Sequence, residues 1–213
     1  NTTVAYLPST ISYTYDGNGN LTTNGTRIFE YNDENQLTRI IEPNAWKSEF
    51  FYDGRQRRRV RKAFTWSAGA WLQTNEVRYI CDNNVVLQER DANNLPVVSY
   101  IRGIDLGGGI QAAGGIGGLL ARTDHLTLDP QRSTCFYHGD RAGNVTVLIN
   151  QAQRVVAKYL YDPYGNLISQ TGPLAAPNVY RFASKECDPA SGLIWFGKRF
   201  YEPTLQRWIS RDP

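Results

Sequence analysis

The sequence predicts an all-β protein built from stacked β-hairpin repeats. Its 213 residues include 19 glycines and 13 tyrosines. Many turns between aromatic strands would give that composition, whereas a helical bundle would not. A second observation is that a short motif recurs along the chain, and such internal repeats indicate a repeat architecture.

Each copy of the motif reads as one hairpin. Alternation of an aromatic residue, any residue and tyrosine predicts a strand with its rings on one face. Asp or Asn followed by Gly or Asn predicts the turn, and an apolar residue begins the return strand. A lone hairpin is marginal in water, so successive hairpins must share one continuous sheet. We therefore interpret the tyrosines as packing residues and not as ligands. The copies are Tyr13–Thr22, Phe29–Thr38, Phe50–Arg58, Arg78–Val86, Cys135–Val145 and Tyr159–Ile168.

A basic run from Arg55 to Lys62 is the main concentration of charge in a chain whose net charge is only +3. Strict strand alternation places Arg57, Arg59 and Arg61 on one face. The other face then receives Arg58, Val60 and Lys62. Because the charge is divided and no aromatic residues are interleaved, we interpret the run as a solvated or lumen-facing strand and predict no nucleic-acid partner.

Neither metal nor cofactor binding is predicted. Cys81, Cys135 and Cys187 lie about fifty residues apart, which gives neither a disulfide framework nor a zinc-type pair. His125 and His138 have no partner at metal-binding spacing. We interpret the three cysteines as small buried hydrophobic residues.

The glycine tract Gly107–Gly118 suggests a phosphate-binding loop, and Gly107, Gly109 and Ala112 partly fit the dinucleotide-binding pattern. It lacks the Gly-Lys-Ser/Thr ending and has no strand–helix–strand setting. We expect a close-packed or mobile inserted segment, in which glycine permits close backbone approach. The surrounding apolar stretch, Leu106–Ala121, is too short and too rich in glycine to span a membrane.

Residues 178–213, called the core block below, have a sequence pattern different from that of the repeats. Two aromatic strands flank Asp188-Pro189 and Gly192, and a third element follows the turn at Glu202. The core block resembles the RHS-repeat-associated core domain, and the upstream hairpins resemble YD (tyrosine-aspartate) repeats. The chain departs from the family pattern at Cys187, Glu202 and Gln206. Glycine is usual at the position of Gln206, so this departure puts the geometry of the local turn in question.

The resemblance implies part of a spiral β-barrel shell closed by the core segment, like toxin-complex cocoons and teneurin shells. We expect YD/RHS hairpins over 1–103 and 125–177, a glycine-rich insert over 104–124, and the core block over 178–213. The implied function is structural: a secreted or cell-surface bacterial shell encloses a C-terminal toxic polypeptide. Its expected contacts are neighbouring repeats and that polypeptide. A surface adhesion shell that binds a cell-surface receptor or a glycan is left open as an alternative.

The resemblance also implies a site. Arg211 and Asp212 match the Arg-Asp-Pro step of the family, whose aspartate belongs to a self-cleaving carboxylate pair. The second aspartate of the pair is expected downstream of Pro213. We therefore expect no enzymatic activity from these 213 residues and a latent catalytic role for Asp212 in a longer precursor. The absence of methionine likewise leads us to expect a piece of a longer chain.

Overall fold

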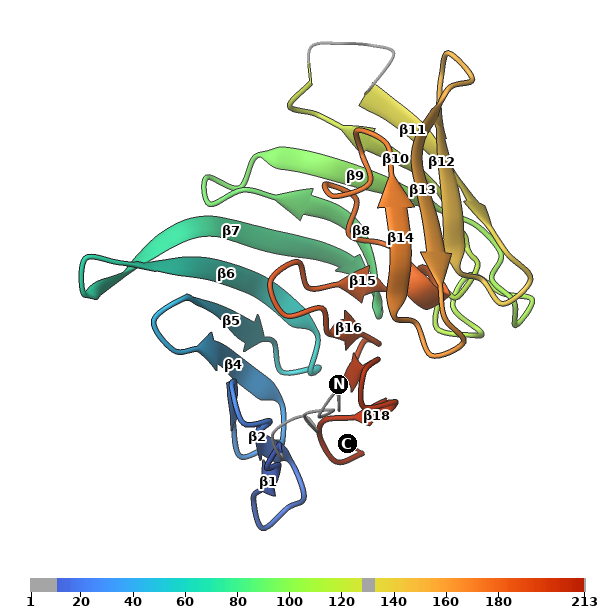
Figure 1. Ribbon diagram of the computed structural model, residues 1–213. Helices are drawn as coiled ribbons and strands as arrows, with labels where there is room; N and C mark the ends of the chain where they lie inside the picture. The colour runs from blue at the N-terminus through green and yellow to red at the C-terminus, as the bar shows by residue number, and fades with distance from the viewer. Residues whose placement is uncertain (1–10, 128–132, 213) are drawn as a thin grey trace, which may run out of the picture.

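A computed structural model describes residues 11–127 and 133–212, and they fold almost entirely into β-strands (Figure 1). A single antiparallel sheet contains fourteen strands, each hydrogen-bonded to the next in the chain. This arrangement confirms the predicted all-β fold of stacked hairpins. The strands are β1 (Thr14–Tyr15), β2 (Leu21–Thr23), β3 (Ile28–Tyr31), β4 (Leu37–Glu42), β5 (Trp46–Tyr52), β6 (Arg58–Ser67), β7 (Ala70–Asp82), β8 (Val85–Arg90), β9 (Pro96–Arg102), β10 (Leu119–Asp124), β11 (Thr134–Gly139), β12 (Val145–Asn150), β13 (Val155–Tyr161) and β14 (Leu167–Thr171).

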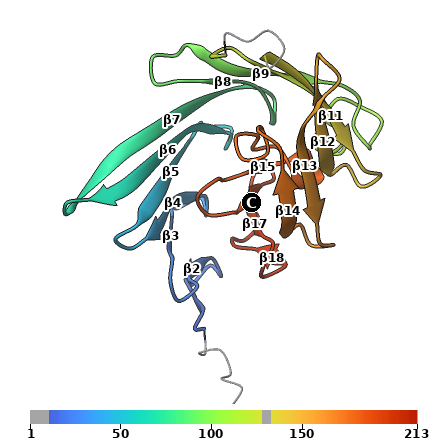
Figure 2. The ribbon, with the colours of Figure 1, turned by 45° about the horizontal axis from the view of Figure 1, so that its top comes forward.

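The core block forms a second, four-stranded sheet. Figure 2 shows the large sheet bending around this small one, which lies on its concave side. The large sheet is open, with β1 and β14 as its two edges among the described residues. The elements are a short 3₁₀ helix η1 (Phe182–Ser184), β15 (Glu186–Cys187), β16 (Ile194–Trp195), β17 (Phe200–Glu202) and β18 (Arg207–Trp208).

One five-residue turn joins successive strands at seven places in the described chain. The first residue is Asp or Asn, and its side-chain oxygen accepts a hydrogen bond from the N–H of the fifth residue. The fourth residue has positive φ, which glycine and asparagine tolerate best. Five of these turns lie in predicted repeat copies, whereas turns 91–95 and 150–154 were not predicted. In the remaining predicted copy, β7 and β8 are joined by a tighter turn at Asn83 and Asn84. The seven turns are 16–20, 32–36, 53–57, 91–95, 140–144, 150–154 and 162–166.

Many of the predicted aromatic residues lie on the buried inner face of the large sheet. Tyr79, Tyr100, Tyr137 and Tyr159 are buried in one hydrophobic cluster over β7–β13. A second cluster, over β2–β5, includes side chains from both sheets. These tyrosines therefore pack as predicted, whereas Tyr13 and Tyr15 of the first copy are exposed. The core block supplies part of the core.

The glycine tract is packed closely between β9 and β10. A Cβ atom at Gly107 would lie 2.8 Å from the Ala112 backbone, and one at Gly118 would lie 2.9 Å from the Gly103 carbonyl oxygen. The main-chain N–H groups of Gly107, Ala113 and Gly115 donate to the Asp105 carboxylate. Glycine is thus used for close approach and for enclosing a carboxylate of the same chain.

Gln206 adopts the backbone conformation that its position demands. Its φ is 56°, and its N–H donates to the Pro203 carbonyl oxygen in the turn between β17 and β18. A residue with a Cβ is strained in this region, which explains why the family pattern has glycine there.

Replacing Gln206 by glycine should raise the free energy of unfolding by about 1 kcal/mol. A residue with a Cβ in the left-handed region costs roughly 1–2 kcal/mol, and glycine avoids this cost. Part of the gain is cancelled because glycine loses more backbone entropy on folding. The matched control is Gln170→Gly in β14, where glycine should destabilise by about 0.5–1 kcal/mol. Urea denaturation followed by tyrosine and tryptophan fluorescence measures both. Equal destabilisation by the two variants would contradict the strain argument.

Candidate functional site

A buried ion pair joins the two sheets. The guanidinium of Arg58, on β6, contacts the carboxylate of Glu186, on β15, and the two side chains are 1% and 3% exposed. The hydroxyl of Tyr79, on β7, donates to the same carboxylate at 2.8 Å. Isolated buried charges are costly, so this site needs both partners together.

Aromatic rings surround the Arg58 guanidinium. Its central carbon lies 4.6 Å from the ring centre of Tyr79 and 5.2 Å from that of Trp195, with Phe50 and Phe200 slightly farther away. Nε and Nη1 are buried without a hydrogen-bond partner among the described residues, and these ring faces take the place of partners. Burial opposes the charge, but the Glu186 carboxylate together with Tyr79 and Tyr52 outweighs it, so the pKa of Arg58 lies above its ordinary value.

A second ion pair lies beside the first. Arg61 Nη1 is 3.4 Å from Asp188 Oδ1, and the Asp188 side chain is fully buried. The other oxygen of Asp188 accepts hydrogen bonds from the N–H and the hydroxyl of Ser191, at 2.9 and 2.7 Å. Asp188 therefore fixes both the turn of its own block and the block's position on β6.

Arg58 and Arg61 lie on the same face of β6, so the prediction from strict alternation, which placed them on opposite faces, is wrong. Phe51 pairs with Val60 whereas Tyr52 pairs with Arg58, so a β-bulge shifts the register at this point. Arg61 pairs with Phe50, which is buried on the inner face. The bulge therefore brings Arg58 and Arg61 to the same side, and strict alternation could not have indicated this.

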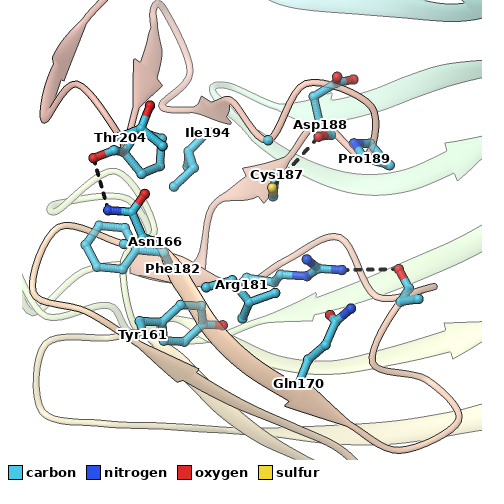
Figure 3. Close-up of a pocket in the computed structure, with 15 residues that line it drawn as sticks. Tyr161, Asn166, Gln170, Arg181, Phe182, Cys187, Asp188, Pro189, Ile194 and Thr204 are labelled. Atoms are coloured by element: carbon cyan, nitrogen blue, oxygen red, sulfur yellow. Dashed lines mark hydrogen bonds between the residues drawn. The ribbon is translucent and has the colours of Figure 1, made fainter. Parts of the chain in front are cut away.

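A cavity of about 420 Å³ lies between the β13–β14 hairpin and the core block (Figure 3). Arg181, in its wall, donates to the main-chain oxygens of Asn178 and Ala175 at 3.0 Å. Burial raises the pKa of the Cys187 thiol to about 11, so it is protonated at neutral pH and a poor nucleophile. These groups suit binding better than covalent chemistry. The lining residues are Tyr161, Gly165, Asn166, Leu167, Gln170, Ala176, Arg181, Phe182, Cys187, Asp188, Pro189, Gly192, Ile194, Pro203 and Thr204.

The two residues predicted from the Arg-Asp-Pro step lie away from this cavity. The Asp212 carboxylate is 79% exposed and forms an ion pair with Arg199, with 2.6 Å between Nη2 and Oδ1. The main-chain N–H of Arg211 donates to Oδ1 of Asn20 at 3.1 Å. The structure thus fixes where both residues lie, and the catalytic role of Asp212 stays a prediction.

Other residues singled out in the sequence have ordinary roles. Cys135 is buried, Cys81 and Cys187 are partly buried, and none of the three forms a disulfide within the described residues. His125 Nε2 shares a 2.8 Å hydrogen bond with the Ser99 hydroxyl. Within residues 11–127 and 133–212 no three His, Cys, Asp or Glu side chains come together as a metal site, and no helix has the length and apolar character needed to cross a membrane.

Replacing Glu186 by glutamine should lower the free energy of unfolding by about 3–5 kcal/mol, because it leaves the buried Arg58 charge without a counter-charge. Glu30→Gln is the matched control: Glu30 pairs with Arg39 at 2.6 Å, yet both side chains are about 40% exposed. Removing that surface pair should cost at most about 1 kcal/mol. Thermal and urea unfolding measure both changes. Similar small losses for the two variants would contradict the structural importance of the buried pair.

Known proteins share sequence with this chain. A family model described as Teneurin YD-shell matches residues 8–70. The tRNA3(Ser)-specific nuclease WapA of Bacillus spizizenii is 28% identical over 207 residues, which are 95% of this chain and 8% of that protein. The toxin subunit YenC1 of Yersinia entomophaga is 30% identical over 74 residues, 33% of this chain and 8% of that protein. The chain therefore spans under a tenth of the length of these relatives.

Solved structures share the fold. The TcdB2-TccC3-Cdc42 crystal structure matches with a TM-score of 0.70 at 19% identity, over 93% of this chain and 10% of that chain. TcdB2-TccC3 without its hypervariable C-terminal region matches with a TM-score of 0.69 at 17% identity, over 93% of this chain and 9% of that chain. The likeness shows that the chain shares the fold of these structures. The repeat turns and the Teneurin YD-shell match over residues 8–70 support its resemblance to RHS/YD-repeat shell proteins.

Proposed function

We propose that this segment forms part of the wall of a shell that encloses a toxic polypeptide carried by the same longer chain. The observation that supports this most directly is the curvature of the large sheet around the core block, together with the buried ion pairs that hold the block on the concave side. A sheet curved in this way has an inside, and a segment fixed to it from within can line an enclosed space.

The names of the relatives suggest what kind of polypeptide is enclosed. The WapA proteins are named as tRNA nucleases and YenC1 as a toxin subunit. Since this chain covers only 8% of each, we assign any nuclease or other toxic activity to another segment of the longer protein and not to these 213 residues. We further propose that the protein is bacterial and acts after secretion or at the cell surface.

Protease protection of the full-length protein tests this function. The polypeptide that follows the core block should resist protease while the shell is folded, and should be degraded when mild denaturant opens the shell. The matched control is the same polypeptide expressed alone, which should be degraded at once. Equal degradation rates in the two settings would overturn the enclosure proposal.

A second role concerns the longer precursor. We propose that Asp212 is one member of a carboxylate pair that cuts the chain downstream of the core block, one carboxylate acting as base and the other as acid. The supporting observation is that Asp212 is exposed yet held in place, by Arg199 on one side and through the neighbouring Arg211 N–H on the other. An accessible carboxylate on a fixed backbone suits such a role.

Asp212→Asn in the full-length protein should abolish cleavage, because an amide can neither accept nor release the proton. Asp33→Asn, at an exposed turn residue, should leave cleavage unchanged. Denaturing gel electrophoresis with mass determination of the fragments measures both. Undiminished cleavage in the Asp212 variant would exclude this role, and the enclosure proposal would stand independently.

A further inference from the structure

The fifth residue of the repeat turn differs between the seven copies, and this difference follows hydrogen bonding of the fifth side chain to the core block. Turn 53–57 also contacts the block, but through its third and fourth residues: Lys198 Nζ donates to the Arg55 carbonyl oxygen and to Gln56 Oε1. Positions one and four make the turn, as described above. Asparagine occupies the fifth position in three of the turns, namely 16–20, 140–144 and 162–166. The connections β1–β2, β11–β12 and β13–β14 all lie at the end of the sheet that faces the core block.

Each of these asparagines is oriented by its own turn. The side-chain Nδ2 of Asn20, Asn144 and Asn166 donates to Oδ2 of the aspartate at the first position, at 2.8, 2.8 and 2.7 Å. The amide is therefore held in a defined plane before it meets any partner. Preorganised polar groups lose little entropy when they bind.

All three oriented amides contact the main chain of the core block. Asn144 Oδ1 accepts from the N–H of Ala183 at 2.8 Å, near the start of the block. Asn166 Nδ2 donates to the carbonyl oxygen of Pro203 at 3.3 Å, between β17 and β18. Asn20 Oδ1 accepts from the N–H of Arg211 at 3.1 Å, near the end of the block. Three separate positions along the block are thus held by the same interaction, a hydrogen bond between an oriented asparagine amide and the main chain.

The other four turns provide an internal comparison. Their fifth residues are Gln36, Arg57, Leu95 and Arg154. Gln36 bonds to Asn32, and Arg57 bonds to Asp53 of its own turn. Across the described part of the chain, none of these four side chains makes a hydrogen bond to the core block.

We propose that asparagine at the fifth position is the docking residue of the repeat turn. It recognises an irregular polypeptide segment through a main-chain N–H or C=O that no strand uses. The turn aspartate orients the amide, and the amide binds the backbone. Because the contact is to the main chain, binding does not depend on which side chain the docked residue carries. This inference concerns the core block as partner and is independent of whether the shell encloses a toxin.

Hydrogen exchange of the 213-residue chain tests the proposal. Asn20→Leu, Asn144→Leu and Asn166→Leu should each keep the turn, since Leu95 occupies this position in turn 91–95. Each should speed exchange by about tenfold only in its own part of the block, since a lost hydrogen bond with an unsatisfied partner is worth that much. The affected parts are 207–212, 181–187 and 203–206, respectively.

Two controls separate docking from general stability. Arg211→Ala should leave exchange in 207–212 unchanged, because Asn20 binds the main chain there. Leu95→Asn, in a turn that does not touch the block, should change no part of it. If a leucine variant does not fold, the glutamine variant at the same position (Asn20→Gln, Asn144→Gln or Asn166→Gln) is used in its place, because Gln36 shows that the turn also accepts glutamine.

We expect each variant to exchange faster only in the block segment that its asparagine contacts. Exchange should stay slow at the turn N–H groups of Gly19, Gly143 and Gly165. Two results would overturn the proposal. One is unchanged exchange in the block, which would mean that the asparagines do not hold it. The other is equal acceleration in the turn and in the block, which would mean that asparagine only stabilises the turn.

Discussion

The buried pair of Arg58 and Glu186 is the interaction on which the arrangement of the two sheets depends. It joins residues 128 positions apart in the chain, one on β6 and one on β15. Removing two charges from water is costly, and here the cost is offset by direct contact, by the Tyr79 hydroxyl and by four aromatic rings. A charge that needs so specific a setting is satisfied in one arrangement only, so the pair selects the position of the core block.

Apolar packing gives that position its stability. Phe200 of β17 packs against Phe50 of β5 at 4.9 Å and against Trp195 at 4.8 Å between ring centres, and Leu193 and Ile209 complete the same buried cluster. Burial of such rings is non-directional and would tolerate several orientations of the block. The ion pairs and main-chain hydrogen bonds supply the direction, whereas the aromatic cluster supplies most of the favourable free energy.

Local pattern was enough to predict the wall, because each hairpin is specified by residues close together in sequence. Tyr79, Tyr137 and Tyr159 pack inward as aromatic alternation indicates, and the aspartates form the turns. The inward pairing of Arg58 and Arg61 could not be found in the same way, since it depends on a bulge at one position of β6. The partners of both arginines lie in the core block, and no local pattern in a single sequence connects segments that distant. The cavity beside β14 also arises only from the packing of the block.

The repeat turn shows how one motif can serve both folding and docking. Its first residue accepts the turn hydrogen bonds and its fourth adopts positive φ, so these two positions are constrained by the hairpin itself. The fifth residue donates its main-chain N–H to the turn, and the native copies hold asparagine, glutamine, arginine or leucine there. Several of these side chains also bond to the first residue, but the turn at Leu95 forms without such a bond. Because that side chain is free to vary without loss of the hairpin, the wall can acquire or lose a contact with the interior one turn at a time. A shell built from such turns can therefore adjust its lining while its sheet remains the same.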